Sequence, residues 1–126
     1  MPSPAASESK VGDRDRGQAT VELALATPVL CLLLLGVVQL AIVVRDQLAV
    51  IEAARVGARA AAVAADPSAA AAGVTAIEGA SVSTSADGRF VTVTVTAMSP
   101  TDVPLIGALL PDVEVTGRAT MLLEPP

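Results

Sequence analysis

Glu22 stands directly before the longest apolar segment of the chain, Leu23–Val44, where an isolated carboxylate is unfavourable. A charged group in a membrane-spanning helix costs about 2.5–3.5 kcal/mol at the bilayer centre and less near the interface. Two interpretations are open. The carboxylate can reach back to water at the headgroups, or it can pair with a cation. Cleavage after Gly17 would create one, because the new α-amine of Gln18 would lie about one helical turn away or on a neighbouring subunit. Such a pair would fix the stagger between adjacent subunits.

The other ionisable and nucleophilic residues offer little for catalysis. The chain has no histidine, and its single cysteine, Cys31, lies in the apolar segment. This argues against nucleophile–base pairs, most transition-metal sites and an intrachain disulfide. The one lysine, Lys10, precedes the apolar segment, and Asp102, Asp112 and Glu114 lack the spacing of a calcium loop. We expect no enzyme activity, cofactor, metal site or small-molecule substrate, and the net charge of −5 without a basic patch argues against nucleic acid.

Leu23–Val44 contains no charged residue and is long enough to cross a membrane. At 1.5 Å per residue it would measure about 33 Å, against roughly 30 Å of hydrocarbon. A cleaved secretory signal is the alternative, but its apolar region runs only about 7–15 residues. We therefore predict a single membrane-spanning helix, mildly kinked at Pro28, which removes one backbone hydrogen bond. Basic residues flank both ends equally and do not orient it. The short N-terminal segment and the larger part after the span fit an N-in, C-out anchor.

The chain divides into three parts. Residues 1–17 carry Pro, Ser, Gly and mixed charge without periodicity, which is typical of disorder, and form either a cytoplasmic tail or a removable leader. Residues 18–65 are predicted to form the spanning helix and its extension, because the stretch from Arg45 to Ala65 is alanine-rich and lacks proline. Residues 66–126 are predicted to form a small extracytoplasmic α+β domain.

The helical extension has two distinct faces. Its charged residues fall within a stripe about 80° wide, which we predict to be in contact with water; they are Arg45, Glu52, Arg55 and Arg59. The small residues on the remaining faces either permit close approach of another backbone or simply reflect helix propensity. As helix-packing residues we single out Ala53, Ala54, Gly57 and Ala58.

The C-terminal part predicts a second short helix and about three antiparallel strands. Asp66-Pro67-Ser68 ends the long helix, and Asp66 or Ser68 can cap a helix through about Ile77. Apolar and polar residues then alternate over 80–85, 91–97 and 113–123, with Asp87-Gly88 as the two-residue hairpin turn. Val103–Leu110 is predicted to form one or two helical turns. The sheet would have one apolar face, for which the helical segment around residues 46–63 is the available cover.

Residues 16–62 resemble the TadE-like minor pilins, or pseudopilins, of the tight-adherence (Flp) pilus system. Gly17 and Glu22 occupy the positions of the glycine before the cut and the glutamate at mature position five in prepilin-peptidase substrates. The runs 22–30 and 36–39 are similar to the family's membrane segment, and 53–61 is similar to its AAREGAR-type helix. The chain departs in having Leu23 where Flp-type proteins commonly have Phe or Tyr.

The resemblance implies a non-enzymatic minor pilin with a pilin-like α+β fold that takes part in assembling a pilus for surface adherence. It would lie in the cytoplasmic (inner) membrane with its N-terminus in the cytoplasm, and a prepilin peptidase would cut between Gly17 and Gln18. Glu22 would guide recognition or subunit packing. The implied partners are lipid, that peptidase, other minor pilins and assembly-platform proteins. The alternative is an uncleaved single-pass anchor that displays a small extracytoplasmic binding domain.

Overall fold

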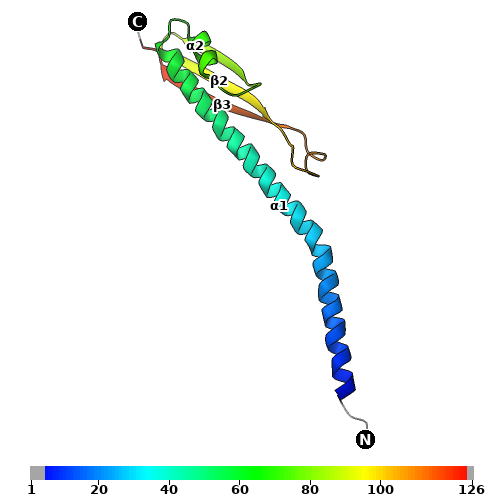
Figure 1. The fold of residues 1–126 in the computed structure, drawn as a ribbon. Helices are drawn as coiled ribbons and strands as arrows, with labels where there is room; N and C mark the ends of the chain where they lie inside the picture. Colours follow the sequence, from blue (N-terminus) through cyan, green and yellow to red (C-terminus); the bar gives the residue numbers. More distant parts are fainter. Residues whose placement is uncertain (1–4, 125–126) are drawn as a thin grey trace.

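A long helix, α1 (Ala5–Val63), organises the molecule, and a small sheet packs on its C-terminal part (Figure 1). The structure is a computed structural model that describes the backbone of residues 5–124 and the side chains of residues 15–124. The predicted span and its extension are one continuous helix, which ends at Val63 shortly before Pro67. Proline disfavours helical backbone in the residue before it, so this end follows from the sequence.

The helix begins earlier than the composition suggested. It starts at Ala5, inside the segment expected to be disordered, and continues through Gly17 without a break. The last proline before the span is Pro4, so no later residue blocks the backbone. Once a helix has nucleated, each added residue gains a hydrogen bond, and polar residues such as those of 5–17 can extend it.

The axis of α1 changes direction between its blue and cyan parts (Figure 1). This region includes Pro28, the proline inside the helix. Its ring lacks an N–H and clashes with the carbonyl one turn earlier, which accounts for the predicted kink.

Three antiparallel strands follow α2 (Pro67–Val74): β1 (Ser81–Asp87), β2 (Phe90–Ser99) and β3 (Val113–Leu122). They form one sheet in the order β1-β2-β3, with Val82 opposite Val95 and Val95 opposite Gly117. The predicted alternation is confirmed most clearly on β2, where Val91, Val93 and Val95 are buried. The α+β class, with a helix covering one face of a three-stranded sheet, is likewise confirmed.

The β1–β2 turn is shifted by one residue from the prediction. Its two loop residues are Gly88 and Arg89, and Asp87 already pairs with Phe90. Gly88 has a φ of +52°, so the glycine occupies the first loop position, as in type II′ turns, and not the second. The Arg89 carbonyl accepts a hydrogen bond from the Leu123 N–H at 2.8 Å, which ties the turn to the residues after β3.

The prediction that 103–110 forms one or two regular helical turns is wrong. The segment is a loop of consecutive turns with isolated helix-like bonds, such as Gly107 N–H to the Val103 carbonyl at 2.8 Å. Leu105 has a φ of +69°, in the left-handed region, and this residue interrupts any right-handed helix.

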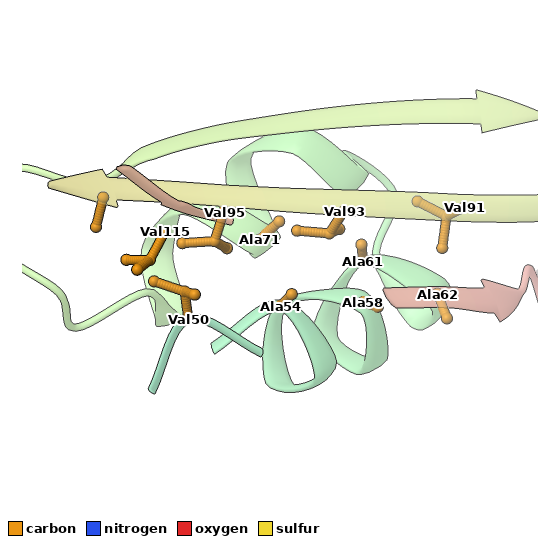
Figure 2. Close-up of a cluster of buried hydrophobic side chains, with 11 residues drawn as sticks. Val50, Ala54, Ala58, Ala61, Ala62, Ala71, Val91, Val93, Val95 and Val115 are labelled. Carbon is orange, nitrogen blue, oxygen red and sulfur yellow. The ribbon is translucent and has the colours of Figure 1, made fainter. Parts of the chain in front are cut away.

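The core lies between α1, α2 and the apolar face of the sheet (Figure 2). Val50 from α1 meets the valines of β2 and β3, while alanines bring the next turns of α1 close to the sheet. Because alanine and valine bury little apolar area each, close approach of the backbones is what fills this interior. The fully buried residues from the helices are Val50, Ala54, Ala58, Ala61 and Ala71.

Asp66 caps α2, one of the two residues predicted for this role. Its Oδ1 accepts hydrogen bonds from the Ser68 hydroxyl at 2.7 Å and from the N–H groups of Ser68 and Ala69, both at 3.1 Å. The Ser68 hydroxyl, with the backbone N–H groups, lowers the pKa of the Asp66 carboxyl below its ordinary value.

This cap predicts a pH dependence of stability. A lowered pKa in the folded state means that the contribution is fully present above the ordinary pKa of 3.8 and is lost as the pH falls through the lower folded value. We expect Asp66→Ala to lower Tm at pH 7 and to lower it progressively less as the pH falls below about 4. Thermal unfolding followed by circular dichroism tests this, with Asp87→Ala as the control. A Tm difference that does not change with pH would show that the charge of the Asp66 carboxylate contributes nothing to the cap.

Candidate functional site

Gln18 and Glu22, which follow the predicted cleavage point, lie on one exposed face of α1. The Gln18 side-chain amide donates to Glu22 Oε1 at 3.4 Å, across one helical turn. Gly17 is exposed, and a Cβ added there would meet no other atom within 4 Å. The structure therefore brings Gln18 and Glu22 together, and among residues 15–124 no packing contact requires glycine at position 17.

The segment that follows Glu22 exposes apolar side chains on nearly every face. Leu23 is 68% exposed and Leu25 70%, and exposure of this kind continues through Leu40. A core helix of a soluble protein would bury such residues, so this helix is not covered by its own chain. By length and composition it can cross a membrane, which is consistent with a membrane anchor or a signal segment.

The four small residues predicted to pack helices face the chain's own sheet and α2. Ala54, Gly57 and Ala58 are buried, and Ala53 is half-buried. A Cβ added to Gly57 would lie 3.2 Å from Val93 Cγ1 and 3.7 Å from the Ala71 Cβ. The close approach that the small residues permit therefore occurs within the molecule. In this arrangement Ala54, Gly57 and Ala58 are covered by the chain's own sheet and α2.

The charged stripe of the helical extension is exposed, as predicted. Arg55 and Glu52 form an ion pair at 3.5 Å with both side chains more than half exposed. Arg45 and Arg59 are exposed on the same side. Exposed pairs of this kind contribute little to stability, so the stripe serves as a solvated edge of the helix.

Three contacts that anchor the sheet on α1 were not predicted. The Ser99 hydroxyl donates to Asp46 Oδ2 at 2.6 Å, and the Gln47 amide donates to the Thr116 carbonyl at 2.8 Å. At Gly117, an added Cβ would overlap the carbonyl group of Val50. The sequence held one signal for the first of these contacts. Asp46 lies four residues before Val50 and so on the same face of the helix, and a carboxylate on an apolar face needs a hydrogen-bond partner.

One of the three carboxylates near the β2–β3 loop, Asp112, has a structural use. Asp112 Oδ1 accepts the Thr101 N–H at 2.9 Å, and the Thr101 hydroxyl donates to the Pro111 carbonyl at 3.0 Å. These two bonds close the base of the loop. Among residues 15–124, no three His, Cys, Asp or Glu side chains gather where they could hold a metal ion.

An exposed apolar helix that continues into a helix packed on a small antiparallel sheet defines a pilin-like class of protein. Residues 17–59 match a family model described as TadE-like protein, so this segment of the chain is similar to TadE-like proteins. The match starts at Gly17 and takes in Glu22, the apolar segment and the small-residue stretch of α1. Comparison with curated proteins and with solved structures found no match.

Proposed function

We propose that this chain is a non-enzymatic minor pilin, or pseudopilin, that takes part in assembling a tight-adherence (Flp) pilus. The observation that carries the proposal is the continuity of α1 from Gly17 and Glu22, through an uncovered apolar segment, into the helix that holds the sheet. The match to TadE-like proteins over the same segment supports a role in a pilus system.

In this proposal, α1 crosses the cytoplasmic membrane once, with the N-terminus in the cytoplasm and the sheet outside. The exposed side chains of the apolar segment contact lipid and, during assembly, the equivalent helices of other pilins. The sheet domain argues for a minor subunit, because a major Flp pilin is little more than leader and helix.

A prepilin peptidase would remove residues 1–17 on the cytoplasmic side and leave Gln18 as the new N-terminus. The Gln18 side chain already lies one turn from Glu22 on the same face. The new ammonium of Gln18 would therefore arise within reach of a carboxylate, in the same subunit or the next. A charge pair of this kind in an apolar helix bundle holds subunits at one stagger, because removing one partner leaves the other charge unpaired.

Deletion of the gene in cells with a working pilus system tests the proposal. We expect surface pili and adherence to be lost and to return when the wild-type chain is supplied from a plasmid. Normal piliation in the deletion strain would contradict the proposal and favour the alternative, an anchored binding domain. Blotting for the major pilin in both strains confirms that its supply is unchanged.

A further inference from the structure

The loop between β2 and β3 carries eight consecutive residues without a charged or polar side chain, Val103–Leu110, here called the apolar loop. Leu109 is 76% exposed, Leu105 65% and Leu110 54%. Three leucines on one short exposed loop are unusual for a surface that faces only water.

The apolar loop has a defined shape. Val103 is buried and anchors its start, and the Leu110 N–H donates to the Ile106 carbonyl at 3.0 Å. A Cβ at Gly107 would overlap the Thr101 carbonyl, so the turn closes tightly on its own base. The hydrogen bonds from Thr101 to the Asp112 carboxylate and to the Pro111 carbonyl hold that base together. The exposure of the leucines is thus set by the fold and not by fraying.

The position of the apolar loop follows from how the sheet lies on α1. Ser99, the last residue of β2, bonds to Asp46, and the chain then continues toward the N-terminal part of α1 (Figure 1). Gln39 lies two turns before Asp46 on the same face and is only 6% exposed, whereas Val38 and Leu40 beside it are exposed. From the direction of the chain after Ser99 and the burial of Gln39, we infer that the apolar loop lies beside the last turns of the apolar segment, which ends at Val44.

We propose that the apolar loop inserts its leucines into the outer leaflet of the membrane that α1 crosses. This rests on the proposed function, in which α1 is a membrane span. Gln39 lies five residues inside the end of the apolar segment, which corresponds to about 7 Å. That depth matches the roughly 5–10 Å at which apolar faces of interfacial segments are buried.

A lipid surface fits this loop better than a protein partner. The apolar loop offers no side chain that could form an ion pair or a hydrogen bond, so it carries no means of selecting a specific surface. Its nearest carboxylates, Asp102 and Asp112, lie at its two ends, on the side of the sheet domain. Because the sheet is fixed on α1, insertion of the loop as a second attachment would restrain rotation of the whole molecule about the axis of α1.

Single tryptophans test the inference, because the chain contains no tryptophan or tyrosine. The full chain would be reconstituted in phosphatidylcholine vesicles with lipids brominated at a shallow acyl position, dilute enough that most vesicles hold one copy. Leu109→Trp and Leu105→Trp report on the loop. Val29→Trp, in the span, is the positive control. Phe90→Trp, at the opposite end of β2, is the negative control.

We expect both loop tryptophans to lose most of their emission to shallow bromines and to emit at shorter wavelength than Phe90→Trp. Adding Leu109→Asp and Leu110→Asp to Leu105→Trp should abolish the quenching. Circular dichroism and an unchanged Tm verify that each variant folds.

The possible failures are distinguishable. Absence of quenching at Val29→Trp under deep bromination would overturn the span and with it the proposed function. Quenching at Val29→Trp without quenching at the two loop positions would overturn the loop inference alone. Loop emission that is blue-shifted but unquenched would also overturn it, because the leucines would then be buried against protein.

Discussion

Replacing Gly117 with valine is expected to detach the sheet from α1. The Gly117 Cα faces the backbone of Val50 and Ile51, and any Cβ would overlap the Val50 carbonyl group. Overpacking a core usually costs about 1–3 kcal/mol because side chains shift to make room. Here the obstacle is a helix backbone held in place by its own hydrogen bonds, so we expect about 3 kcal/mol or more.

Loss of this size is a large share of the stability of a small domain. Thermal unfolding of the full chain in detergent, followed by the strand signal in circular dichroism, measures it. Gly73→Ala is the matched control, since an added Cβ there meets nothing within 4 Å and alanine favours the helix that contains it. Equal Tm values for Gly117→Val and the wild type would contradict the packing of β3 on Val50.

Replacing Glu22 with alanine is expected to leave a membrane-inserted protein that does not support pilus assembly. The carboxylate makes no packing contact that the fold requires, and its one hydrogen bond is to the exposed Gln18 amide. Stability of the sheet domain should therefore be unchanged. In the proposed pairing, however, the Gln18 ammonium of the processed chain would have no carboxylate partner in the helix bundle.

Complementation of the deletion strain measures this effect. We expect Glu22→Ala to reach wild-type levels in the membrane fraction while surface pili fall below detection. Glu52→Ala is the control: it removes a glutamate from the same helix, but one whose exposed pair with Arg55 contributes little. Wild-type piliation with Glu22→Ala would exclude a role for this carboxylate in assembly.

The elements of the fold with local signals could be predicted from the sequence. Composition indicated the helix of the apolar segment and its alanine-rich extension, and the alternation of apolar and polar residues indicated the strands. The structure confirms these elements. The turn register could not be read in this way. Moving the two-residue loop by one position pairs Val82 with Val93 instead of Val95, and both registers keep valine opposite valine on the apolar face.

Contacts between distant segments were harder to predict. The small residues of α1 indicated that a backbone would approach closely, but helix periodicity does not say whether that backbone belongs to the same chain. In the structure the approaching segments belong to the same chain. Gly57 lies against β2 and α2, and Val50 lies against β3. The sequence indicated only that Gly117 lies on the apolar face of a strand. The requirement for glycine at this position arises from the contact between β3 and the helix, which the sequence does not show.

At the candidate site, too, local geometry could be predicted from the sequence and the role of the residues could not. Spacing alone placed Gln18 and Glu22 on one helical face, and the structure puts them in contact. The chemistry assigned to them depends on an event at Gly17 that a single folded chain does not need. The roles of Gly17 and Glu22 in processing and assembly therefore remain predictions, whereas the structure shows Ala54, Gly57 and Ala58 buried within the chain.

The mature N-terminus tests the central claim most directly. Mass spectrometry on protein purified from native membranes, for the wild type and for Gly17→Ala, gives the first residue of each. The proposed function predicts a wild-type chain that begins at Gln18 and a Gly17→Ala chain that keeps its first seventeen residues. A wild-type chain that begins at Met1 or Pro2, in cells whose pilus system works, would contradict the claim and leave an uncleaved membrane anchor.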